Sequence, residues 1–211
     1  MMKMSMKNGI YLVVDPSIDR DVLLDKLQQA IEGKIIAVQI WDNFKAVADV
    51  KTLTNEIIDL CKPHNIPVLI NNQWELLLET ALNGVHFDIV PNNFDQLKQR
   101  LDKDTILGIT CGNDLSVVKW ADENKLDYIS FCSMFPSTTA NSCELVSFET
   151  IKATRKITSL PIFLAGGIKP ENIHLFSELN YAGIAVVSGI MNAENPTEAL
   201  KKYTETINLI K

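Results

Sequence analysis

Short apolar segments alternate with amphipathic segments along the chain, and this alternation restricts the fold more than any other feature of the sequence. Each apolar run ends at polar or small residues, and a stretch with helical spacing of apolar side chains follows it. The predicted strands cover residues 10–14, 35–40, 66–70, 84–87, 105–109, 128–131, 161–165 and 183–187. Strict strand–helix alternation predicts a parallel sheet with right-handed crossovers. Eight such units in 211 residues predict a closed (β/α)8 TIM barrel, a single domain over residues 1–211.

The intervening helices are predicted from spacing, caps and helix breakers. Asn93 is expected to cap one of them, and Pro170 suits the first turn of another. The predicted helices cover residues 21–31, 51–61, 74–82, 93–101, 114–123 and 148–156, a segment from 170 onward, and 197–210.

Composition narrows the class of protein. A hydrophobic share of 46% supports a full core, and a net charge of −6 argues against a nucleic-acid or membrane partner. No apolar run is long enough to span a bilayer, and residues 1–7 lack the apolar stretch of a signal peptide. The four cysteines, Cys61, Cys111, Cys132 and Cys143, show no metal-binding spacing. We therefore expect reduced thiols in a cytoplasmic protein, and the roles of Cys111 and Cys132 stay open.

Two strand ends in the last third of the chain carry the pattern of a phosphate site. One strand runs into Gly166 and Gly167, and the other runs into Val187 and Ser188. In a βα barrel the ends of the seventh and eighth strands commonly form a phosphate cup from main-chain N–H groups. The alternative is that the glycines only make tight turns. The place of both segments at the end of the chain favours the phosphate site.

These segments and others in the same order resemble the thiamine phosphate synthase superfamily. The resemblance rests on residues 11–16, 38–39, 70–72, 84–86, 107–110, 127–129, 135–139, 165–168 and 186–190. It implies an enzyme that couples hydroxymethylpyrimidine diphosphate to thiazole phosphate and releases diphosphate, with Mg²⁺ as cofactor. Carried over by position, Gln39 and Asn71 face the diphosphate substrate, and Thr110, the candidate catalytic residue, replaces a serine near the diphosphate. Ser137 and Thr139 match the hydroxyls that bind the thiazole phosphate, and Gly166, Gly167, Val187 and Ser188 match the phosphate cup.

Several positions depart from the family pattern, and all the departures weaken a diphosphate site. The motif Gln-x-Arg-x-Lys reads Gln39-Ile40-Trp41-Asp42-Asn43 here, and a loop lysine is Ala140. Asn72 and Pro91 replace the two carboxylates that hold Mg²⁺. Because departure of diphosphate depends on such charges, we predict weak or absent synthase activity. We assign no metal ligand from the sequence and expect Mg²⁺ only if synthase activity is retained.

Other interpretations stay open. The chain could be a non-catalytic binder or regulator of a small phosphorylated heterocycle. It could be a thiazole tautomerase, although the histidine of that branch is Gly112 here, or a sugar or indole phosphate isomerase with Asp15 as base. Trp41 either plugs the pocket or stacks on a ligand ring, and His86 is either hydrogen-bonded structure or a catalyst. A homodimer is also left open.

Overall fold

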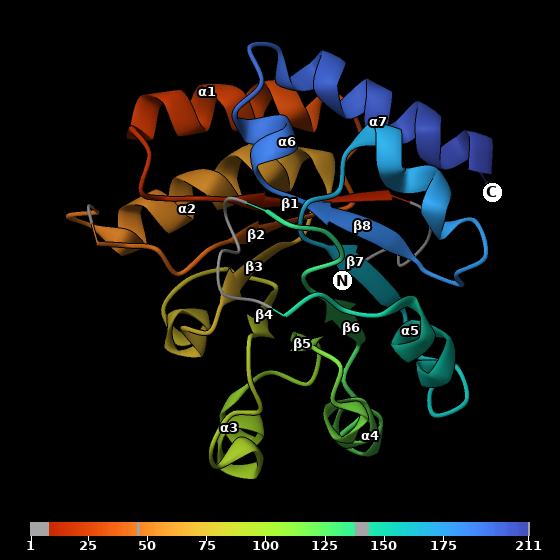
Figure 1. The fold of residues 1–211 in the computed structure, drawn as a ribbon. Coiled ribbons are helices and arrows are strands. Elements are labelled where there is room, and N and C mark those ends of the chain that lie inside the picture. Colours follow the sequence, from red (N-terminus) through yellow and green to blue (C-terminus); the bar gives the residue numbers. More distant parts are fainter. Residues whose placement is uncertain (1–8, 46, 138–143, 211) are drawn as a thin grey trace.

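The computed structural model describes residues 9–45, 47–137 and 144–210. Eight parallel strands close into a barrel in which each strand pairs with the next and β8 pairs with β1 (Figure 1). The strands are β1 (Gly9–Val14), β2 (Ala37–Ile40), β3 (Val68–Asn71), β4 (Gly84–Phe87), β5 (Ile106–Cys111), β6 (Tyr128–Phe131), β7 (Ile162–Ala165) and β8 (Gly183–Val186). This architecture confirms the predicted TIM barrel.

Helices surround the ring of strands, and α1 and α7 lie side by side on its outside (Figure 1). The α-helices are α1 (Arg20–Ile31), α2 (Val50–Cys61), α3 (Phe94–Arg100), α4 (Leu115–Glu123), α5 (Phe148–Thr154), α6 (Ser188–Met191) and α7 (Pro196–Ile210). The 3₁₀ helices are η1 (Lys62–His64), η2 (Trp74–Leu78) and η3 (Pro170–Phe176). None of the described helices is both long and apolar enough to cross a bilayer.

Two of the predicted α-helices are 3₁₀ helices, η2 and η3. The segment of η2 must return from the end of β3 to the start of β4, where Asn83 bonds to Val68 through both its main chain and its side chain. Within η2 the Leu76 N–H donates to Gln73 O and the Glu79 N–H donates to Leu76 O, the i→i+3 pattern of a 3₁₀ helix. Asn93 does stand at the N-cap of α3. Its φ is +59°, however, and its side chain makes no capping bond, so the predicted mechanism of that cap is wrong.

Side chains on the strands alternate between two cores. One set packs against the helices in a large apolar cluster. The other fills the barrel, and its largest members are Tyr11, Tyr128 and Phe163. Their rings meet edge to face with centroids 5.4 to 5.9 Å apart, the arrangement that the ring quadrupole favours. This aromatic layer closes the barrel interior below the carboxyl ends of the strands.

Gly108 makes room for the Tyr128 ring. The two residues are partners in the register between β5 and β6. A Cβ atom at residue 108 would overlap the Tyr128 ring itself. The missing side chain on β5 therefore fixes where the aromatic layer sits.

Candidate functional site

Above the aromatic layer, toward the carboxyl ends of the strands, polar side chains line the barrel interior. Each lies two residues after an interior position of its strand, so the strand period of two turns it inward. They are Gln39, Asn71, His86, Thr110 and Ser130. Four of them are buried, whereas Thr110 is partly exposed. The structure thus brings together the four predicted residues Gln39, Asn71, His86 and Thr110.

Hydrogen bonds join these groups to the aromatic layer. The Tyr11 hydroxyl contacts Gln39 Oε1 at 2.9 Å and the Tyr128 hydroxyl at 2.8 Å. His86 Nδ1 lies 2.9 Å from the Tyr128 hydroxyl, and its Nε2 lies 2.8 Å from Thr110 Oγ1. The imidazole also stacks on the Tyr128 ring with centroids 5.5 Å apart. His86 therefore has partners on both ring nitrogens, as its interpretation as hydrogen-bonded structure requires.

Burial keeps this interior network uncharged near neutral pH. Desolvation lowers the pKa of His86 to about 4, although the negative charge of Asp88 opposes the shift. The same burial raises the pKa of the Tyr11 and Tyr128 hydroxyls above their usual value. The network therefore contains neutral donors and acceptors, whose directions matter more than their charge.

The rim beside β2, β3 and β4 carries carboxylates held by amides. The Asn72 side-chain NH₂ lies 2.8 Å from Asp42 Oδ2 and 2.8 Å from Asp88 Oδ2, so it bridges the two carboxylates. Asn72 Oδ1 accepts from the Asp88 main-chain N–H at 2.9 Å, which fixes the amide orientation. Asn71 donates to Asp88 Oδ1 at 3.1 Å. In the described parts of the chain no lysine or arginine forms an ion pair with these carboxylates.

This arrangement does not fit a magnesium ion. The ion would have to replace an amide donor that already satisfies both carboxylates. Mg²⁺ demands near-octahedral oxygen coordination. Over residues 9–45, 47–137 and 144–210 no group of three or more acidic, cysteine or histidine side chains is placed to hold a metal. Pro91 offers no carboxylate of its own, and Asp88 is already bonded to both Asn71 and Asn72.

The predicted phosphate cup lies at the same end of the barrel. β7 and β8 pair in parallel through Ala165 and Ala185, so the segments after them leave the barrel side by side. Gly166 and Gly167 adopt left-handed φ values of +87° and +64°, which favour glycine. Val187 and Ser188, both partly exposed, follow β8 and begin α6.

The glycines also have a packing role. A Cβ atom at Gly166 would overlap Ser133, and one at Gly167 would overlap the carbonyl oxygens of Phe135 and Pro136. The loop after β6 therefore lies against the glycines, and it leads to Ser137, which is partly buried. Thr139 falls outside the described residues. Both readings of the glycine pair agree with this geometry, so phosphate binding stays a prediction.

Two further predicted positions are placed by the structure. Trp41 is partly buried directly after β2, where its main-chain N–H donates to Val14 O. Its plug and stacking roles both stay predictions. Cys111 is buried in the cluster between strands and helices, where burial raises the pKa of its thiol to about 12. It does not line the site, whereas Cys132 is only partly buried.

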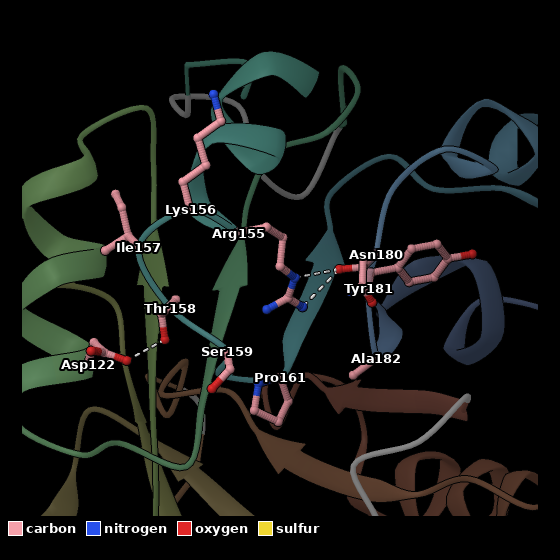
Figure 2. A pocket seen from close by; sticks show the side chains of 10 residues that line it. All are labelled: Asp122, Arg155, Lys156, Ile157, Thr158, Ser159, Pro161, Asn180, Tyr181 and Ala182. Atoms are coloured by element: carbon pink, nitrogen blue, oxygen red, sulfur yellow. Dashed lines mark hydrogen bonds between the residues drawn. The ribbon is translucent and has the colours of Figure 1, made fainter.

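A different hollow, of about 880 Å³, lies at the opposite end of the barrel, where β7 and β8 begin (Figure 2). Its central side chain is Arg155, whose guanidinium donates to the carbonyl oxygens of Asn180 and Leu160. Lys156 extends away from the other labelled side chains (Figure 2). Because chemistry in βα barrels sits at the carboxyl ends of the strands, we assign Arg155 a structural role that ties two loops together.

Tyr11, Tyr128, Ser130 and Asp42 were not identified as site residues from the sequence. The interior position of the two tyrosines follows from the strand period, and Gly108 opposite Tyr128 signals a bulky partner. Tyrosines in apolar runs look like ordinary core residues, so only the hydrogen bonds reveal their link to the site.

Comparison with known proteins identifies a matching family model, related sequences and a structure with the same fold. The family model described as thiamine monophosphate synthase matches residues 10–190. The thiamine-phosphate synthase of Hydrogenobaculum sp. is 32% identical over 204 residues, which cover 93% of this chain and 92% of that protein. The Methanobrevibacter smithii thiamine-phosphate synthase is 27% identical over 188 residues, or 89% of this chain and 90% of that protein. The thiamine phosphate pyrophosphorylase structure from Pyrococcus furiosus shares the fold, with a TM-score of 0.83, 18% identity and 99% coverage of both chains.

Proposed function

Because this chain belongs to the thiamine monophosphate synthase family, we propose that it serves thiamine biosynthesis by binding a phosphorylated thiazole or pyrimidine, with weak or absent synthase turnover. The family supplies the class of ligand. The described residues at the barrel mouth argue against efficient release of diphosphate.

The observation that carries this proposal is the Asn72 amide between Asp42 and Asp88. A synthase must stabilise the negative charge that develops on departing diphosphate. Two unit charges 4 Å apart interact by about 4 kcal/mol at an effective dielectric of 20. A neutral amide supplies none of that stabilisation, and the neighbouring carboxylates oppose the leaving group.

Support for a phosphate monoester comes from the other side of the mouth. Gly166 and Gly167 have left-handed φ values, and successive main-chain N–H groups in turns of this kind form anion-binding concavities without a lysine or arginine. Ser188 follows the neighbouring strand β8 and adds a hydroxyl at the same end of the barrel. A monophosphate needs only this modest help because it is bound and not expelled.

A synthase assay with both substrates and Mg²⁺ tests the catalytic half of the proposal. We expect turnover below about 1 s⁻¹, the lower end of the usual range for enzymes. The matched variant combines Trp41→Arg, Asn43→Lys and Asn72→Asp, which rebuild the charges of the family motif, and we expect it to turn over faster. Wild-type turnover of about 1–10³ s⁻¹ would contradict the proposal.

Calorimetry tests the binding half. We expect thiazole phosphate or thiamine phosphate to bind the wild-type chain, and Gly167→Ala to weaken that binding because an added Cβ overlaps two carbonyl oxygens. If neither compound binds at millimolar concentration, the proposed ligand class is wrong.

A further inference from the structure

Counting protons gives a direction to every bond in the chain of contacts from Gln39 to Thr110. The Tyr11 hydroxyl donates to Gln39 Oε1. Because a phenol has a single proton, Tyr128 must donate in the contact between the two hydroxyls. Tyr128 then has no proton left for His86, so His86 Nδ1 is the donor in the 2.9 Å contact between them.

The remaining nitrogen of the imidazole completes the count. Burial keeps His86 neutral by lowering its pKa, and a neutral imidazole carries one proton. That proton is on Nδ1, so Nε2 is bare and accepts from the Thr110 hydroxyl at 2.8 Å. Ser130 Oγ lies 3.3 Å from Thr110 Oγ1 and 3.5 Å from Nε2, and because the Thr110 proton is already given to Nε2, Ser130 is the donor in these longer contacts.

We propose that this chain of hydrogen bonds fixes His86 as the Nδ1–H tautomer and thereby makes the Thr110 hydroxyl a hydrogen-bond acceptor toward the ligand. Gln39, Tyr11 and Tyr128 are the positioning residues of this device. Thr110 is the partly exposed member of the network, so its accepting oxygen is accessible from the barrel mouth.

An oxygen that only accepts selects the chemistry of its partner. A phosphoryl oxygen of an ionised phosphate has no proton to donate. Its lone pairs would face a lone pair of the Thr110 oxygen, and the two oxygens would repel each other. An amino group of a heterocycle donates an N–H and is favoured. The resemblance to the family placed Thr110 near a diphosphate, whereas the direction of its hydrogen bond assigns it to an amino group.

The direction depends on a single amide. If the Gln39 side chain presented its NH₂ to Tyr11, every bond along the chain would reverse, and the Thr110 proton would be free for a phosphate. Gln39 therefore controls a donor or acceptor at Thr110 without contact between the two side chains.

Long-range ¹H–¹⁵N NMR of the full chain tests the tautomer without any ligand. We expect His86 Nε2 to show the shift of an unprotonated nitrogen at pH 7, with the signals assigned by their loss in His86→Gln. In Tyr11→Phe the Tyr128 hydroxyl loses its acceptor and turns to Nδ1, so the proton should move to Nε2. Tyr181→Phe, which changes a buried tyrosine outside the network, should leave the wild-type pattern intact. A protonated Nε2 in the wild-type chain would overturn the proposal.

Ligand preference tests the consequence at Thr110, which also rests on the proposed function. The probes are thiamine phosphate and its analogue in which oxygen replaces the pyrimidine amino group. We expect the wild-type chain to prefer the amino compound by about tenfold, the value of one net hydrogen bond, and Tyr11→Phe to lose that preference. Equal affinity of wild type for both probes would refute the role of Thr110. If neither probe binds, the proposed function fails, while the NMR result still decides the tautomer.

Discussion

Acid should destabilise this protein through His86, and the size of the effect can be worked out. The unfolded chain has an ordinary histidine pKa of 6.5, whereas burial lowers the pKa in the folded protein to about 4. Below pH 6.5 the unfolded state binds a proton that the folded state refuses, so stability falls as the pH falls. Linkage gives a loss of about 2 kcal/mol at pH 5 and about 3 kcal/mol at pH 4, relative to pH 7.

Urea unfolding at pH 7 and pH 5 measures this term when wild type is compared with His86→Gln. Other groups titrate in both proteins, so the difference between the two pH-dependent losses isolates His86. We expect wild type to lose about 2 kcal/mol more than the variant over this interval. His174→Gln removes an exposed histidine and should behave like wild type. Parallel losses in wild type and His86→Gln would refute the burial argument.

Three further predictions concern packing, thiols and metal binding. Gly108→Ala should lower the free energy of unfolding by more than about 3 kcal/mol or prevent folding, because the added Cβ overlaps Tyr128. Gly112→Ala, which has open space around it, should change the free energy of unfolding by less than about 0.5 kcal/mol in the same urea titration. Burial raises the thiol pKa of Cys61 and Cys111 to about 12, so both should resist iodoacetamide at pH 8 in the native protein and react with it in urea. Mass spectrometry measures the labelling, and rapid labelling of either thiol in the native protein would contradict its burial. Asn72→Asp should bind Mg²⁺ at least about tenfold tighter than wild type by calorimetry, because it adds a third carboxylate beside Asp42 and Asp88. Asn83→Asp, at the opposite end of β4, should leave the Mg²⁺ affinity unchanged. Unchanged affinity in Asn72→Asp would show that these carboxylates cannot converge on an ion.

The barrel could be predicted from the sequence because its signals are local and repeated. Apolar runs such as 66–70 and the helical spacing after them need no knowledge of distant residues. The helix predicted over 74–82 is wrong in type and length, because apolar spacing indicates a helical segment but does not distinguish an α-helix from a short 3₁₀ helix.

The candidate site was predictable in position and not in detail. Strand ends pointed to Gln39, Asn71 and Thr110, because polar residues after buried strands gather at one rim. The resemblance to the family also implies that a carboxylate is replaced at Asn72. It does not show that the amide bridges Asp42 and Asp88, since those residues lie 30 and 16 positions away along the chain. Hydrogen-bond direction likewise emerges only when Tyr11 and Tyr128 are seen to touch.

The edge-to-face rings of Tyr11, Tyr128 and Phe163 close the bottom of the polar interior. The aromatic layer therefore separates the hollow around Arg155 at the opposite end from the polar interior. Any molecule that rests on Thr110 must depart through the opening by which it arrived. One bound molecule must therefore leave before the next can enter.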